Sequence, residues 1–183
     1  MSQQVSIHKD LVERCRRGDA KAQHELYHAY AQAMYNVAYR IVNDRFEAED
    51  ILQECFVTVF RKLDTFRGDS SFGAWLKRVV INRSINTVKR RKMEFDRMDE
   101  NNNEPVYVEE EETESEWTNY TVADVKKAMA ELPEGYRVVF SLFMFEDWSH
   151  QEIAEELGIT ESTSKSQLNR AKKKLKELIC MNI

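Results

Sequence analysis

Apolar residues recur at intervals of three and four along nearly the whole of this 183-residue chain. Residues that interrupt helices are scarce, with only five glycines and two prolines. This spacing places apolar side chains on one face of an α-helix, so successive segments are expected to be amphipathic helices. The sequence therefore predicts an all-α protein, with room for one domain or two small ones.

Charge is distributed very unevenly, although the whole chain carries a net charge of only −5. Residues 1–93 carry 17 basic against 11 acidic residues, a net charge of +6. Residues 94–118 carry 1 against 11, a net charge of −10, and residues 119–183 carry 9 against 10. A basic segment beside an acidic one indicates a polyanionic partner for the basic one, so the acidic balance of the whole chain does not exclude nucleic acid.

The apolar periodicity predicts two small helical domains, at residues 6–93 and 119–183. Residues 94–118 contain three asparagines, Pro105 and a run of four glutamates, and like charges at that density extend a chain that cannot bury a core. We interpret this segment as an acidic flexible linker. The helices of the first domain are expected over residues 10–17, 19–41, 48–63 and 72–92, and those of the second over residues 121–132, 135–146, 150–157 and from 161 onward.

The stretch from residue 147 to residue 178 predicts a helix-turn-helix. Ser149 is a suitable N-cap for a short helix, Gly158 breaks that helix, and Thr160 stands where a new N-cap belongs. A short helix, a glycine turn and a longer basic helix form the layout in which the second helix enters the DNA major groove. An ordinary helical hairpin is the alternative, but the basic second helix favours DNA because phosphate neutralisation dominates affinity.

One short pattern favours a different chemistry. His24, Glu25 and His28 form an HExxH spacing, which on a helix can bind zinc and supply a glutamate base, with Glu47 or Glu49 as a further ligand. Because the pattern is short and no cleft accompanies it, a zinc hydrolase is only a distant alternative. No phosphate-binding loop, nucleophile elbow or DxD cluster occurs, so we expect neither an enzyme nor a cofactor or resident metal.

The cysteines and the apolar runs indicate the cellular compartment. Cys15, Cys55 and Cys180 are odd in number, far apart and without a CxxC pair, which suits a reducing cytoplasm. No run of about 18 apolar residues occurs, and the first ten residues lack the pattern of an export signal. We therefore expect a cytoplasmic protein without membrane insertion.

Three segments together resemble the bacterial sigma factors, specifically the two-domain extracytoplasmic-function group of the sigma-70 family. They are AEDILQECF at residues 48–56, FRGDSSFGAWLKRVVINRSINTVKRR at residues 66–91 and SHQEIAEELGITESTSKSQLNRAKKKL at residues 149–175. The resemblance runs from about residue 9 to residue 180 and keeps the order and spacing of both domains. Three motifs in order are far more specific than any one of them alone.

The resemblance implies three sets of site residues. The polymerase-docking set would bind the clamp helices of the largest subunit of core RNA polymerase, and the other two sets would read the minus-ten and minus-thirty-five promoter elements. The docking set is Asp50, Gln53 and Glu54; the minus-ten set is Phe66, Arg67, Lys77, Arg78, Asn82, Arg83 and Asn86; the minus-thirty-five set is Lys165, Ser166, Asn169 and Arg170.

The residue types of these sets suit their implied roles. Asparagine both donates and accepts, so it can read the Watson–Crick edge of an unstacked base, while arginine and lysine hold the backbone. On a recognition helix, arginine and lysine suit guanine and asparagine suits adenine. Lys165, Ser166, Asn169 and Arg170 lie at i, i+1, i+4 and i+5, which is one helix face.

Three positions leave questions open. Asn86 stands where the family more often has aspartate, which alters the local charge and the base preference expected there. Ser164 stands where the family usually has valine, so the tilt of the second helix is undetermined. Trp75 could stack on a base, but its i, i+4 relation to Val79 favours a place in the core.

Taken together, these features predict a DNA-binding subunit that recruits core RNA polymerase to specific promoters and helps to melt the minus-ten region. The resemblance also implies an anti-sigma factor as a partner in many members of the group. The main alternative is a stand-alone helix-turn-helix regulator of duplex operators. That alternative does not need the basic, asparagine-bearing helix or the acidic docking helix at residues 9–93.

Overall fold

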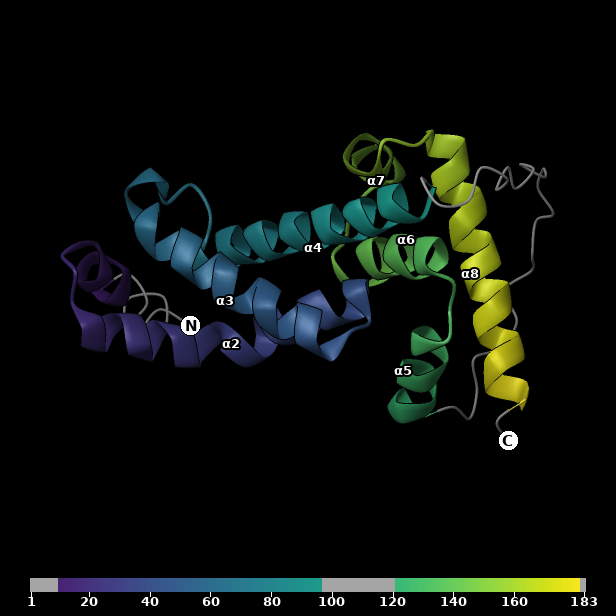
Figure 1. Ribbon diagram of the computed structural model, residues 1–183, viewed down its shortest axis with the longest axis horizontal. Helices are drawn as coiled ribbons and strands as arrows, with labels where there is room; N and C mark the ends of the chain where they lie inside the picture. Colours follow the sequence, from purple (N-terminus) through teal and green to yellow (C-terminus); the bar gives the residue numbers. More distant parts are fainter. Residues whose placement is uncertain (1–9, 97–120, 182–183) are drawn as a thin grey trace. The chain divides into compact units, whose positions relative to one another are not determined.

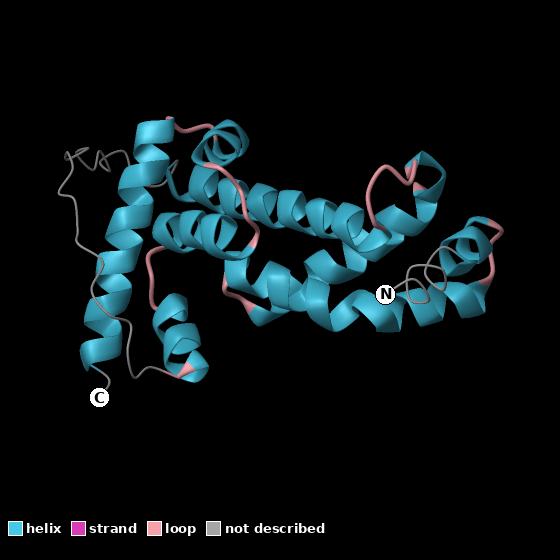
Figure 2. Cartoon of the chain, turned by 180° about the vertical axis from the view of Figure 1, so that it is seen from behind, coloured by secondary structure: helices cyan, strands magenta, loops and turns pink. Residues whose placement is uncertain are grey.

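The computed structural model describes residues 10–96 and 121–181, and the elements within those ranges are helices (Figures 1 and 2). No strand occurs in the described residues, which confirms the all-α prediction. The chain divides into two compact units, the first ending at Thr87 and the second beginning at Val88, so the division falls within α4. No described helix combines the length and the apolar character that crossing a membrane requires.

The first unit is a small helical bundle. Residues 10–16 are helical and lead into α2 (Ala20–Val42) and α3 (Arg45–Arg61), followed by the short 3-10 helix η1 (Leu63–Thr65) and by α4 (Phe72–Asp96). Asp19, the first residue of the helix expected over residues 19–41, caps α2, its carboxylate accepting from the backbone N–H of Lys21 at 2.9 Å and of Ala22 at 3.2 Å. These bonds satisfy N–H groups that have no partner within the helix, so they decide where α2 begins.

The core of this unit is the apolar stripe that the sequence predicts on each helix. The helices α2 and α3 pack directly against each other. Trp75, which the spacing favours for the core, is only half-buried, as are Tyr30 and Phe60. The fully buried side chains include Leu26 and Ile41 of α2, Val59 of α3, Leu63 of η1, and Leu76, Ile81 and Ile85 of α4.

The second unit comprises α5 (Val122–Ala130), α6 (Glu134–Phe145), α7 (His150–Leu157) and α8 (Glu161–Met181). The long helix α8 packs against the other three, and Figure 1 shows α5 alongside it and α6 running crosswise to it. Its buried residues Leu168, Ala171, Leu175 and Ile179 are spaced by three and four, so they form one continuous stripe. Leu157 and Ile159, the apolar residues on either side of Gly158, are half-buried.

The domain bounds and the linker are only partly covered by the described residues. Residues 97–118 of the predicted acidic linker lie outside them, and residues 94–96 belong to the end of α4. The domain bounds of 6–93 and 119–183 therefore stay predictions.

Two valines of α3 offer a direct check of the burial pattern. Val59 is 1% exposed and Val57 is 49% exposed, although both lie in the same helix. We expect Val59→Ala to lower the free energy of unfolding by about 2 kcal/mol, because it removes buried methyl groups and leaves a cavity. Val57→Ala should change it by less than about 0.5 kcal/mol. Urea unfolding followed by circular dichroism compares the two, and equal effects would contradict the packing described.

Candidate nucleic-acid interfaces

A groove with a volume of about 840 Å³ lies in the first unit, between α3 and α4. Residues from two of the predicted sets meet in it, Gln53 and Glu54 from α3 and the asparagines and Arg83 from α4. Phe66, Arg67, Lys77 and Arg78 do not line it. The complete lining is Gln53, Glu54, Cys55, Val57, Thr58, Val59, Arg61, Lys62, Thr65, Trp75, Val79, Asn82, Arg83 and Asn86.

Asn82 brings an unsatisfied polar group to this groove. Its side-chain oxygen Oδ1 is buried and has no hydrogen-bond partner among the described residues. Such orphaned atoms are uncommon in folded proteins and need an explanation, such as a ligand that binds there. Asn86 lies one turn further along α4, is exposed, and lines the same groove. The two asparagines therefore offer hydrogen-bonding groups along one stripe of the helix.

The burial of Trp75 is intermediate between that expected of a core residue and that expected of a residue free to stack on a base. Its ring centroid is 5.2 Å from that of Phe66 and 5.9 Å from that of Phe72, so one part of the indole packs in an aromatic cluster. The side chain is nevertheless half-buried and lines the groove with Asn82 and Asn86. Trp75 is thus neither a core residue nor a free stacking platform, but a groove wall supported by two other rings.

The connector that carries Phe66 is held in place by the helix at residues 10–16. Arg16 Nε donates to the backbone carbonyl of Leu63 at 3.3 Å, and Arg16 Nη2 donates to the carbonyl of Phe66. Phe66 in turn packs edge-on against Phe72, which opens α4. A guanidinium that spans two carbonyls restricts this segment, so the loop is presented to a ligand in a defined shape. Sequence reasoning missed Arg16, because nothing in the order of residues links it to a loop about fifty positions later.

The start of α4 also depends on a close approach that only glycine permits. A Cβ atom added to Gly73 would lie 2.8 Å from Cε1 of Tyr30, a side chain of α2. Ser71 caps the helix, its hydroxyl accepting from the backbone N–H of Ala74 at 3.2 Å. The sequence pattern carried no signal for the contact of Gly73 with Tyr30.

The charged residues of the groove are paired across the two helices. Glu54 of α3 forms an ion pair with Arg83 of α4, and each side chain is about half exposed. A member of the predicted docking set thus holds a member of the predicted minus-ten set. The Cys55 thiol beneath them is buried, and burial raises its pKa to about 12, so it stays protonated and is not a nucleophile.

The outward face of α3 carries more than the predicted acids. Asp50 and Gln53 are exposed, as is Phe46, which is 75% exposed. With Val57 these residues lie at i, i+4, i+7 and i+11, and this spacing places them on one face of the helix. Two apolar side chains exposed beside an acid and an amide are typical of a surface that binds another protein. The sequence analysis did not identify Phe46 and Val57. Both are apolar residues outside the buried stripe of α3, and that position is a signal by which the sequence could have revealed them.

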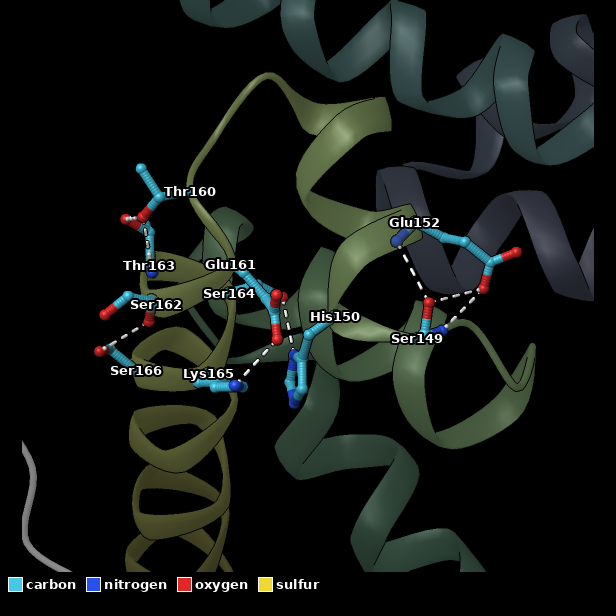
Figure 3. A network of polar contacts seen from close by, with 10 residues as sticks. All are labelled: Ser149, His150, Glu152, Thr160, Glu161, Ser162, Thr163, Ser164, Lys165 and Ser166. Atoms are coloured by element: carbon cyan, nitrogen blue, oxygen red, sulfur yellow. Dashed lines mark hydrogen bonds and ion pairs between the residues drawn. The ribbon is translucent and has the colours of Figure 1, made fainter.

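The second unit contains the predicted helix-turn-helix, shown in Figure 3. Ser149 and Glu152 form a capping box, in which Ser149 Oγ accepts from the Glu152 N–H at 3.2 Å and the carboxylate accepts from the Ser149 N–H at 2.9 Å. Gly158 ends α7 with φ of 70°, a conformation that side chains disfavour. Thr160 Oγ1 accepts from the N–H of Thr163 at 3.0 Å, as expected for the cap of α8.

The predicted minus-thirty-five residues lie in the first three turns of α8. Lys165 and Asn169 are exposed, and Ser166 and Arg170 are half-buried. Lys165 is paired with Glu161 at 2.8 Å, and this lysine lowers the pKa of the Glu161 carboxyl. The face is therefore basic and polar, with hydrogen-bond donors that suit base edges and phosphates.

The zinc pattern does not form a complete site in the described residues. His24 and His28 are exposed on α2, with their Nε2 atoms 3.0 Å apart. No group of three or more histidine, cysteine, aspartate or glutamate side chains is placed to hold a metal within the described ranges. Glu47 and Glu49 thus do not supply the further ligand that a zinc hydrolase needs.

The comparisons of this chain with family models and with known proteins agree with one another. The family model described as Sigma-70 region 2 matches residues 26–94, and that described as Sigma-70, region 4 matches residues 123–175. The RNA polymerase sigma-H factor of Pseudomonas aeruginosa is 31% identical over 172 residues, which cover 90% of this chain and 89% of that protein. The ECF RNA polymerase sigma factor SigW of Bacillus subtilis is 26% identical over 188 residues, covering 92% and 95%.

A solved structure has the same fold. The sigma factor RpoE of Bartonella quintana, crystallised in complex with the anti-sigma factor NepR, aligns with a TM-score of 0.53 at 23% identity. The alignment covers 87% of this chain and 98% of that one. At this level of identity the likeness concerns the fold alone.

The ion pair in the groove leads to a prediction about stability. Because Glu54 and Arg83 are both about half exposed, Glu54→Gln should change the free energy of unfolding by less than about 1 kcal/mol. Urea unfolding of the variant beside the wild type measures this. A larger loss would mean that the pair supports the fold, and Glu54 would then be unsuited to a binding role that must disengage it from Arg83.

Proposed function

The chain belongs to the extracytoplasmic-function group of bacterial RNA polymerase sigma factors, and from this we propose that it directs core RNA polymerase to specific promoters. It recognises the minus-ten and minus-thirty-five elements and promotes DNA melting. The observation that carries the proposal is the groove of the first unit, where the unpartnered oxygen of Asn82 lies beside an acidic helix face. We further propose that the two domains comprise residues 6–93 and 119–183.

The exposed face of α3 is the proposed polymerase-docking surface. Asp50, Gln53 and Glu54 supply acceptors for a basic partner such as the clamp helices of the largest subunit. Phe46 and Val57 add apolar area at the two ends of the same face. Exposed carboxylates between apolar side chains give both charge complementarity and buried area, which are the usual parts of a specific interface.

The groove between α3 and α4 is the proposed site for the unstacked minus-ten strand. Asn82 and Asn86 offer donors and acceptors to base edges, and Trp75 offers a wall against which a base can pack. Arg83, with Arg67, Lys77 and Arg78, supplies positive charge for the backbone. Phe66 acts through the connector, since it supports Trp75 and is itself held by Arg16.

The basic face of α8 is the proposed reader of the minus-thirty-five element. Lys165, Ser166, Asn169 and Arg170 contact bases and phosphates in the major groove, the usual role of the second helix of this motif. Catalysis belongs to the polymerase, so we assign no catalytic role to this chain. We place it in the cytoplasm with its polymerase, and we expect an anti-sigma factor among its partners.

The alternative is a stand-alone regulator that binds duplex operators through the helix-turn-helix alone. It leaves the groove of the first unit and the exposed apolar residues of α3 without a role. Binding to core polymerase separates the two functions, since only a sigma factor requires it.

The first test is therefore affinity for core RNA polymerase. We expect Asp50→Ala/Glu54→Ala to weaken binding of the full chain to core enzyme by about 10- to 100-fold, because two charged contacts to a basic surface are lost. Asp10→Ala/Glu25→Ala removes two exposed carboxylates from the same unit, but outside α3, and should leave the affinity unchanged. Fluorescence anisotropy of labelled protein titrated with core enzyme measures both, followed by run-off transcription on genomic fragments.

The outcomes of this test are distinct. New transcription start sites that depend on the wild-type chain support the sigma function. No binding to core enzyme, together with direct binding to duplex DNA, would establish the stand-alone regulator instead.

A second test addresses the reading of the minus-ten strand. On a promoter found by run-off transcription, Asn82→Ala should reduce open-complex formation by about 10-fold while affinity for core enzyme is retained. Permanganate reactivity of unpaired thymines measures the melting. Asn36→Ala, which removes an exposed asparagine of α2, is the control and should have no effect. If both variants melted the promoter like the wild type, the groove would not be the strand-reading site.

A further inference from the structure

His150 is placed where three helices of the second unit meet. It is the first residue of α7, and its Nδ1 atom lies 2.9 Å from Oγ of Ser164 on α8, as Figure 3 shows. Its ring stacks on Phe143 of α6, with the centroids 4.6 Å apart and the planes inclined by 23°. The orientation of the imidazole is therefore set by α6, and its polar edge is directed at α8.

Ser164 is the residue through which this contact acts on the recognition helix. Its side chain is fully buried, at 0% exposure, one residue before Lys165. A buried hydroxyl requires a hydrogen-bond partner, and His150 provides one. The valine that the family resemblance implies at this position would pack by shape alone. A hydrogen bond also has a preferred direction, so it restricts rotation of α8 about its own axis.

The proposed recognition residues come directly after Ser164 in α8. Lys165 and Ser166 are the next two residues after Ser164, and Asn169 and Arg170 lie within the following two turns. Hydrogen bonds to base edges need donors and acceptors at defined distances and angles, so a small rotation of the helix changes which base is favoured. The contact buried behind the helix can thus alter the reading of DNA without touching it.

The imidazole also titrates in a charged environment. Lys165, Lys172 and Glu161 of α8 act on it electrostatically, and Phe143 of α6 covers one face of its ring. Burial lowers the pKa of His150 below its ordinary value of 6.5, with further lowering by Lys165 and Lys172 and an opposing effect of Glu161. The docked ring therefore binds a proton less readily than a free one. The contribution of the contact is complete above pH 6.5 and is lost as the pH falls below that value.

We propose that His150 and Ser164 are a positioning pair, whose hydrogen bond sets the orientation of α8 and so determines base preference at the minus-thirty-five element in a pH-dependent manner. The inference rests on the proposed function and deepens it. It assigns specificity to two residues that lie behind the DNA-facing side chains. Sequence reasoning treated Ser164 only as a departure from the family pattern.

The test uses holoenzyme assembled from the full chain and core RNA polymerase. The probe is a promoter found by run-off transcription, with its upstream element randomised, and sequencing of the transcripts gives the preference at each base. We expect His150→Leu and Ser164→Ala each to change the preference at one or more bases by about five-fold, the effect of one hydrogen bond. Because both remove the same contact, the double variant should change it no further.

A conservative variant separates positioning from titration. The amide of asparagine can replace Nδ1 as a hydrogen-bonding group but does not titrate, so His150→Asn should keep the wild-type preference at about pH 7.5. As the pH is lowered in steps below 6.5, the wild-type preference should broaden, and that of His150→Asn should not. His24→Asn changes an exposed histidine of α2 and should respond to pH as the wild type does.

The results distinguish this inference from the proposed function. If wild-type holoenzyme starts no transcription, the proposed function itself fails. If it does, but His150→Leu and Ser164→Ala lower all transcripts equally and leave the preference unchanged, the pair only stabilises the fold and the inference is overturned. If the preference of His150→Asn changed with pH as the wild-type preference does, the pH-dependent part of the proposal would likewise be overturned.

Discussion

The burial of one stripe of α8 is the interaction on which the second unit depends. Leu168, Ala171, Leu175 and Ile179 form that stripe, and α5, α6 and α7 pack against the helix. Burial of apolar side chains is the main favourable contribution to folding, so it holds α8 in place without using its polar residues. The opposite face remains available for a ligand. One amphipathic pattern thus provides both the buried face that anchors α8 and the exposed face proposed to read DNA.

The same division between faces applies to α4 in the first unit. Leu76, Val80 and Ile81 are buried, while Asn86 and Arg83 line the groove beside α3. The helix therefore contributes to the core and to the candidate strand-reading site along the same turns. What this helix cannot supply by itself is the shape of the groove. That shape depends on α3 opposite it and on Trp75, which two other aromatic rings support.

Polar contacts between helices have a different role from the apolar stripes. The ion pair of Glu54 with Arg83 and the hydrogen bond of His150 with Ser164 each join two helices beside a proposed binding surface. Such contacts contribute little net stability, because water competes for the same groups in the unfolded chain. Their value lies in direction, since they restrict how one helix is rotated relative to the next. In both units, these polar contacts therefore add direction to a packing that the apolar stripes provide.

The sequence by itself determined the fold class, the helix caps at Ser149 and Thr160, and the motifs of the sigma family. These features follow from local rules, because a periodic stripe, a capping hydroxyl or a glycine turn acts within a few residues. The order of residues also placed the basic and acidic sets on their helices. Each such property is complete within one segment of the chain.

Only the tertiary structure decided which of those residues act together. Arg16 reaches a connector about fifty residues later, Gly73 must admit the ring of Tyr30, and Ser164 finds its partner in His150. Trp75 is half-buried for the same reason, since its exposure depends on where Phe66 and Phe72 pack. These contacts join segments far apart in sequence, and helical periodicity carries no information about which helix faces which. Packing in three dimensions sets those pairings, and the geometry of both candidate interfaces depends on them.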